Sequence, residues 1–226
     1  VMGTVHLLDA VRRTPSATAV IVVTTDKVYD NREWSWGYRE SDALGGREPY
    51  GNSKACAEFA VEAYRRSYFD HGKTAIATVR AGNIIGGGDW AQDRIVPDAV
   101  RAFSAGRPLI IRNPAAVRPW QHVLDAARRL LLLAERIASR KLPPALDSWN
   151  LGPGDAETVP VSALVEMLVT HWGAGAAWEH RGDNQVAEAH FLTLDSHQAR
   201  HHLGWAPAWR VAPAIAHSVR WYKDFL

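Results

Sequence analysis

The sequence predicts an α/β fold built around a parallel sheet, and three observations carry this prediction. Residues 19–25 and 74–79 form two short, continuous, β-branched apolar runs, which are typical of strands buried on both faces. The segment Tyr50–Asp70 between them has helical spacing, so the three elements make a strand–helix–strand unit with a right-handed crossover. Of the 226 residues, 47% are hydrophobic and 22% are charged, which is sufficient for one sizeable core.

The other elements follow from the spacing of apolar residues. Met2, Val5, Leu8 and Val11 recur on one helical face near the start of the chain. Residues 26–49 predict a long loop, and the aromatic side chains within it argue that it is ordered. Further helices are expected at residues 95–104, 123–139, 161–172, 196–203 and 211–225.

Charge and cysteine content exclude several classes of protein. The formal net charge is +2 and no run of four Lys or Arg occurs, which argues against a nucleic-acid binder. The lone Cys56 excludes a disulfide framework and a multi-cysteine zinc site. No apolar stretch approaches the roughly 18 residues of a membrane span. We therefore expect a cytoplasmic protein without a nucleic-acid, membrane or metal partner; His197, His201 and His202 are expected on a solvated helix face.

Polar residues gather where the two predicted strands end, which is where parallel sheets bind ligands. The first strand ends at residues 24–27 and the second at residues 80–83. Between them, Tyr50 and Lys54 lie four residues apart and therefore on one face of a helix. A lysine ammonium beside a phenol favours the phenolate, which can remove a proton from an alcohol.

The combination of Thr25 with Tyr50 and Lys54 resembles the extended short-chain dehydrogenase/reductase superfamily. The resemblance implies NAD as the cofactor and Tyr50 as the acid and base. Lys54 would bind the nicotinamide ribose, and Thr25 would hydrogen-bond the substrate hydroxyl. It also implies that Thr24 and Ala81 contact the cofactor, together with Tyr50 and Lys54.

The residues after Thr25 narrow this resemblance to the nucleotide-sugar 4,6-dehydratases, most of which carry Thr-Asp-Glu at this point. Here the sequence is Thr-Asp-Lys, and this lysine, with the motifs at 31–40 and 86–90, resembles the branch that acts on CDP-glucose. Asp26 is then expected to protonate the leaving C6 hydroxyl. Lys27 acts either as a neutral base or as an electrostatic stabiliser of the enolate, and the sequence leaves both roles open.

The reaction implied is dehydration of CDP-glucose to CDP-4-keto-6-deoxyglucose. It proceeds by transient oxidation at C4, elimination across C5 and C6, and return of the hydride to C6. An NAD-dependent nucleotide-sugar epimerase, which would need Tyr50 but not Asp26, is one alternative. A truncated, non-catalytic nucleotide-sugar-binding remnant is another.

Cationic and aromatic residues in the second half of the chain match the substrate-binding motifs of this family. Arginine offers a planar fork suited to pyrophosphate. The resemblance assigns to the substrate Asn83, Arg94, Arg112, Arg118, Trp120 and His122.

The Gly-x-x-Gly-x-x-Gly turn that meets a dinucleotide pyrophosphate does not occur in the sequence. We therefore expect the C-terminal part of a Rossmann-like parallel sheet with flanking helices, plus a smaller α/β substrate-binding lobe. Residues 1–85 would be the remaining part of the NAD-binding domain, and residues 86–226 mainly the substrate lobe, with segments able to return to the sheet. The resemblance also implies a homodimer through the Tyr50–Asp70 helix.

Overall fold

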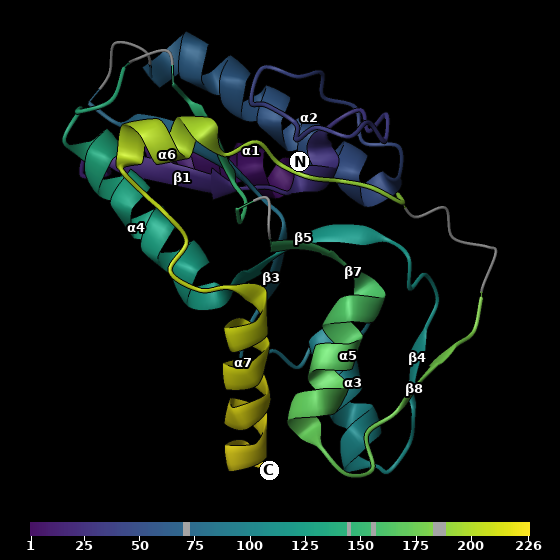
Figure 1. Cartoon of the computed structure of the whole chain (residues 1–226). Helices are drawn as coiled ribbons and strands as arrows, with labels where there is room; N and C mark the ends of the chain where they lie inside the picture. Colours follow the sequence, from purple (N-terminus) through teal and green to yellow (C-terminus); the bar gives the residue numbers. More distant parts are fainter. Residues whose placement is uncertain (70–72, 144–145, 155–156, 183–188) are drawn as a thin grey trace. The chain divides into compact units, whose positions relative to one another are not determined.

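The computed structural model describes the chain except for residues 70–72, 144–145, 155–156 and 183–188. The chain divides into two compact units, each built from three separate segments (Figure 1). Unit 1 comprises Val1–Gly82, Ala126–Gly152 and Leu192–Ala206, and unit 2 comprises Asn83–Asp125, Pro153–Phe191 and Pro207–Leu226. The sequence predicts a boundary at 85/86, and in the structure two later segments belong to the same unit as the first 82 residues.

Unit 1 holds a three-stranded parallel sheet in the order β1-β2-β6. Its strands are Ala19–Val23, Ala75–Ala81 and Ser148–Leu151. Val22 pairs with Thr78, which pairs in turn with Ser148. This confirms the predicted parallel sheet. The first strand is shorter than predicted, because Thr25 begins the turn that follows it.

Helices cover both faces of this sheet because its residues alternate between two cores. Ile76 packs with Leu8 of α1 (Met2–Arg12) and Val61 of α2 (Pro49–Tyr64), whereas its neighbour Ala77 packs in a second core with Leu133 of α4 (Val123–Ala138). The helices of unit 1 are α1 (Met2–Arg12), α2 (Pro49–Tyr64), the part of α4 (Val123–Ala138) from residue 126 onward, and α6 (His197–Leu203), with a π-turn η2 (Arg65–Phe69) after α2.

The loop at 26–49 is ordered by buried aromatic rings, after a 3₁₀ turn η1 (Asp26–Val28). Tyr29 and Tyr38 stack with ring centroids 4.9 Å apart. The Tyr29 hydroxyl donates to Asn150 Oδ1 over 2.6 Å, and Asn150 Nδ2 donates to the Tyr38 carbonyl over 2.7 Å. Since Asn150 belongs to β6, the sheet itself fixes the loop beside its strands.

Unit 2 has its own core, in which Trp120, Leu164 and Ile215 are buried. Strand β5 pairs parallel with β3 and antiparallel with β7, and β4 pairs parallel with β8. Its strands are β3 (Asn83–Ile85), β4 (Leu109–Ile111), β5 (Val117–His122), β7 (Thr158–Pro160) and β8 (Trp178–His180), and its helices are α3 (Ile95–Ser104), α5 (Val161–Trp172) and α7 (Val211–Phe225). Among the described residues, no helix combines the length and apolarity needed to cross a bilayer.

Candidate active site

The predicted tyrosine–lysine pair lies at the start of α2. Glu48 caps this helix: its carboxylate accepts from the amides of Tyr50 (2.7 Å) and Gly51 (2.6 Å), and Pro49 suits the first turn. Lys54 Nζ lies 5.9 Å from the centroid of the Tyr50 ring, and the Tyr50 side chain is half exposed. The pair therefore shares one open helix face, as the spacing predicts.

The predicted acid and its lysine neighbour lie in η1, directly after β1. The Thr25 hydroxyl donates to Asp26 Oδ1 over 3.1 Å and accepts from the Lys27 amide. Asp26 is 1% exposed, and its Oδ2 has no hydrogen-bond partner among the residues that the structure describes. Lys27 Nζ lies 3.6 Å from Asp26 Oδ1, with its side chain 39% exposed. Three predicted catalytic residues thus form one hydrogen-bonded, ion-paired turn.

Two glycines allow α2 to approach this turn. A Cβ on Gly51 would lie 2.4 Å from the carbonyl oxygen of Lys27, and a Cβ on Gly46 would lie 2.7 Å from the same oxygen. Real Cβ atoms do not approach backbone so closely. The catalytic turn and the helix of Tyr50 therefore meet at a backbone-to-backbone contact that any larger residue would widen.

Behind this contact is a buried polar network that sequence reasoning missed. Glu58 accepts hydrogen bonds from the Thr24 hydroxyl, from the Thr78 hydroxyl (2.7 Å) and from Arg80 Nη2 (3.0 Å). Arg80 also donates to the Tyr29 hydroxyl over 3.0 Å. The available signals were an acidic residue on the inward face of α2 and an arginine inside a largely apolar strand. Burial raises the pKa of Tyr29 above its usual range, although Arg80 opposes this.

The structure buries two residues that the sequence predicts as cofactor contacts, Thr24 and Ala81, in the interior of unit 1. The Thr24 hydroxyl lies within hydrogen-bond distance of Glu58 and of the Val79 carbonyl, so the protein itself satisfies it. Ala81 is buried at the end of β2. Neither side chain is open in this structure.

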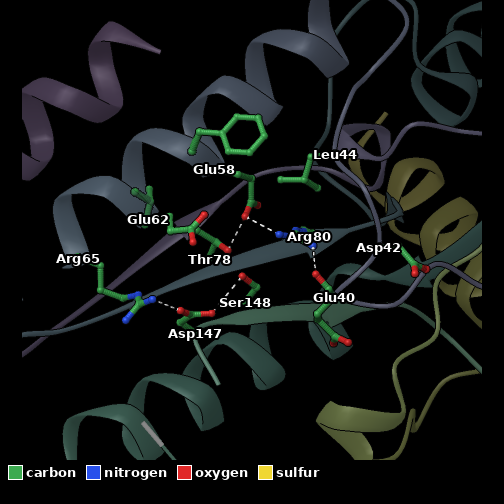
Figure 2. A pocket seen from close by; sticks show the side chains of 12 residues that line it. Glu40, Asp42, Leu44, Glu58, Glu62, Arg65, Thr78, Arg80, Asp147 and Ser148 are labelled. Carbon is green, nitrogen blue, oxygen red and sulfur yellow. Dashed lines mark hydrogen bonds and ion pairs between the residues drawn. The ribbon is translucent and has the colours of Figure 1, made fainter. Parts of the chain in front are cut away.

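A pocket of about 330 Å³ opens beside this network, on the side of the sheet that α2 covers (Figure 2). Figure 2 shows the Glu58 carboxylate between Thr78 and Arg80 at its wall. The predicted catalytic side chains are not among its lining residues, which are Glu40, Asp42, Leu44, Glu58, Phe59, Val61, Glu62, Arg65, Thr78, Arg80, Asp147 and Ser148.

Burial also raises the pKa of Glu40, whose Oε1 accepts from the Asn150 amide over 2.8 Å. The hydrogen bond from the Asn150 amide and, less strongly, nearby Arg80 lower this pKa in part without reversing the direction. The pocket wall therefore combines Glu40, whose pKa burial raises, with carboxyl groups that pair with arginines, among them Glu58 with Arg80.

The substrate residues predicted in unit 2 fall into two groups. Arg94 is exposed and pairs with Asp89 at 3.1 Å, Arg112 is exposed after β4, and Asn83 is half-buried at the start of β3. These side chains are at least partly exposed.

The second group is engaged within unit 2. The Arg118 guanidinium donates to main-chain carbonyls of residues 117, 189 and 190. Trp120 is a core residue whose indole donates to the Val159 carbonyl, and His122 stacks on Trp209 with centroids 4.5 Å apart. Burial lowers the pKa of His122, partly offset by Asp125. Side-chain type and motif could not show that these residues face inward.

Residues 1–152 match the model of the NAD dependent epimerase/dehydratase family. The chain belongs to this family. It is 45% identical, over its whole length, to CDP-glucose 4,6-dehydratase of Salmonella typhimurium, and 30% identical over 98% of its length to dTDP-glucose 4,6-dehydratase of Streptomyces griseus. It spans 64% and 63% of the lengths of these two relatives.

Solved structures support the same fold for this family member. The structure of dTDP-glucose 4,6-dehydratase from Bacillus anthracis in complex with NAD matches with a TM-score of 0.83 at 22% identity. The match covers 99% of this chain and 67% of that chain. UDP-glucuronic acid 4-epimerase from Bacillus cereus matches with a TM-score of 0.83, so the fold is common to dehydratases and epimerases.

Proposed function

We propose that this chain carries the catalytic residues of an NAD-dependent dehydratase that converts CDP-glucose to CDP-4-keto-6-deoxyglucose and water. The observation that carries the proposal is the Asp26–Lys27 pair, which η1 holds against the N-terminal turn of the Tyr50 helix. An epimerase has no use for an acid and a base at this point, whereas elimination of water needs both. The 45% identity to the Salmonella CDP-glucose 4,6-dehydratase supports the same substrate.

The residues present fit the nicotinamide-ribose half of NAD. Tyr50 and Lys54 offer a hydroxyl and an ammonium on one open helix face, and these would hold the ribose hydroxyls. The glycine-rich turn for the pyrophosphate half does not occur in the 226 residues. When bound, NAD supplies a hydride acceptor for C4 and later a hydride donor for C6.

Oxidation at C4 depends on the Tyr50 helix. Tyr50 as phenolate takes the proton of the C4 hydroxyl, and the Thr25 hydroxyl orients that oxygen. The Lys54 ammonium stabilises the phenolate because the two groups share a helix face. The resulting ketone acidifies the proton at C5.

Elimination uses the Asp26–Lys27 pair. Transfer of one proton from Lys27 Nζ to Asp26 within the pair would leave the net charge unchanged and give both an acid and a base. Lys27 then takes the C5 proton, and Asp26 gives its proton to the leaving C6 hydroxyl. Lys27 returns the proton to C5 as the hydride arrives at C6, and the proton held by Tyr50 restores Asp26 through solvent.

The proposal assigns the exposed Arg94 and Arg112 to the pyrophosphate of the substrate, and the half-buried Asn83 to its sugar or phosphate. The proposal gives a structural role, that of shaping the substrate lobe, to Arg118, Trp120 and His122. Their hydrogen bonds and stacking partners are consistent with a supporting role.

The proposal also includes a homodimer in the cytoplasm. Met2 and Leu7 of α1, and Phe59 of α2, are about half exposed apolar side chains on two helices that pack together. A second copy of the chain would cover them, and the free Cys56 fits a reducing compartment. Sedimentation analysis of Phe59→Asp tests the dimer: a shift to monomer supports it, and a monomeric wild type contradicts it.

The function is tested by replacing the matching segment of the Salmonella enzyme with this chain and incubating the product with CDP-glucose and NAD⁺. The expected product has lost water, and Asp26→Asn abolishes it while leaving C4 oxidation measurable. A product of unchanged mass with inverted C4 would show an epimerase instead. Titration of the 226-residue chain alone with NAD⁺ is the companion measurement, and saturable binding would show that the Tyr50–Lys54 face suffices.

A further inference from the structure

We propose that Glu58 is a positioning residue for catalysis, which sets the Tyr50–Lys54 face of α2 against the turn that carries Asp26 and Lys27. The inference rests on the proposed function. It concerns a side chain that does not touch substrate or cofactor and that acts through its hydrogen bonds to Thr24 and to β2.

Spacing places Glu58 on the catalytic face of α2. Tyr50, Lys54 and Glu58 follow one another at intervals of four residues, so they line one side of the helix. Exposure falls along this line: Tyr50 is 51% exposed, Lys54 is half-buried and Glu58 is 4% exposed. This face of α2 is therefore exposed at Tyr50, and two turns later it is fixed by the hydrogen bonds of Glu58.

The partners of Glu58 lie on the strands that lead into the site. Its Oε1 binds the hydroxyl of Thr24, the residue directly before Thr25, and its Oε2 binds Thr78 and Arg80 of β2. Figure 2 shows these two β2 partners converging on the carboxylate. A single side chain thus fixes α2 to the end of β1 and to β2 at once.

The anchor is rigid because its groups are buried and both terminal nitrogens of Arg80 and both carboxylate oxygens of Glu58 are hydrogen-bonded. Arg80 is 3% exposed, and its other terminal nitrogen donates to the Tyr29 hydroxyl and to the Glu40 carbonyl (2.9 Å). A buried charge pair with additional hydrogen bonds permits few alternative arrangements. A shift of about 1 Å in a catalytic group can reduce turnover about 10²-fold, so this anchor matters for rate.

A purely structural role makes a different prediction from a positioning role. Replacing a buried ion pair by apolar residues of similar volume is often neutral for stability. The double variant Glu58→Met/Arg80→Met therefore restores the packing without the link to Thr24. If Glu58 only stabilises the fold, this variant regains both stability and turnover.

The experiment compares the wild-type chain with Glu58→Gln, with the double variant and with Glu62→Gln as a matched control. Glu62 lies one turn further along α2, lines the same pocket and forms a half-exposed pair with Arg66. Tm and the amide hydrogen exchange of residues 50–57 are measured in the chain, and kcat and KM with CDP-glucose and NAD⁺ are measured in the segment-swapped enzyme.

The expected result for the double variant is a Tm within about 4 °C of wild type, with kcat reduced about 10²-fold and KM unchanged. Amides 50–57 should exchange about tenfold faster in both Glu58 variants, and Glu62→Gln should match wild type throughout. Wild-type kcat in the double variant, at wild-type Tm, overturns the inference.

A segment-swapped wild-type enzyme without turnover would count against the proposed function rather than against Glu58. Amide exchange then decides alone: faster exchange at 50–57 in both Glu58 variants supports the anchor, and unchanged exchange overturns it. If the double variant does not fold, Glu58→Gln, which keeps the shape of the side chain, takes its place. The turnover of this variant and its amide exchange at residues 50–57 then decide the inference.

Discussion

Gly51→Ala should separate the catalytic turn from the Tyr50 helix. The added Cβ would lie 2.4 Å from the Lys27 carbonyl oxygen and 2.8 Å from Glu48 Oε1. The side chain of Glu48 can move, but the Lys27 carbonyl belongs to the backbone of η1. Ordinary contact begins near 3.4 Å, so the turn must retreat by 3.4 − 2.4, or about 1 Å.

The substitution should have two effects: overpacking lowers the stability of the fold, and displacement of the turn lowers the rate of turnover. Overpacking a tight contact destabilises by about 1–3 kcal/mol, and each kcal/mol lowers the Tm by roughly 2–4 °C in a chain of this size. A displacement of about 1 Å between Tyr50 and the Asp26–Lys27 pair should reduce kcat about 10²-fold. The assay is thermal unfolding together with turnover of CDP-glucose in the segment-swapped enzyme.

Gly3→Ala is the matched control, because this helical glycine has no atom within 4 Å of a built Cβ. It should raise stability by at most about 1 kcal/mol, the value for a helix interior, and leave turnover unchanged. If Gly51→Ala behaves like Gly3→Ala in both measurements, the close approach of α2 to η1 does not position the site.

Three further predictions concern single side chains. Lys27→Arg keeps a cation beside Asp26 but cannot accept a proton, so kcat in the segment-swapped enzyme should fall about 10²–10⁴-fold; retained activity would show that Lys27 acts only electrostatically. Tyr29→Phe removes the hydroxyl that donates to Asn150 Oδ1 and accepts from Arg80 Nη1, so urea unfolding should show a loss of about 1–3 kcal/mol; an unchanged midpoint would contradict the network. Burial raises the pKa of Glu40, so this group's contribution to stability is fully present below its unfolded pKa of about 4.3 and is lost as pH rises through the folded pKa. Glu40→Gln should therefore gain stability over wild type at pH 7 but not at about pH 3, and an equal difference at both values would refute the assignment.

The periodicity of apolar residues and the composition of the strand segments were sufficient to predict most of the fold. The helices expected at 95–104, 161–172 and 211–225 have these bounds in the structure. The return of β6 to the sheet of unit 1 could not be read from local pattern, because strand pairing is set by contacts between residues far apart in sequence. The end of α2 also differs from the prediction: the α-helix is followed by one turn of π-helix over Arg65–Phe69, which the spacing of residues does not reveal.

The candidate site was predictable where chemistry is local. Tyr50 with Lys54, and Asp26 with Lys27, are neighbours in sequence, so their pairing follows from helix geometry or adjacency. Glu58 was missed because its partners come from distant parts of the chain: Thr24 directly follows β1, and Thr78 and Arg80 belong to β2. The inward orientation of Trp120 likewise depends on the packing of unit 2.

The migration of a label from C4 to C6 tests the central claim most directly. The segment-swapped enzyme is supplied with NAD⁺ and CDP-glucose deuterated at C4, and the product is examined by NMR and mass spectrometry. The Asp26, Lys27 and Tyr50 assignments predict loss of water with the deuterium at C6. Deuterium that stays at C4 of a product of unchanged mass, or that is lost to solvent, would contradict dehydration by these residues.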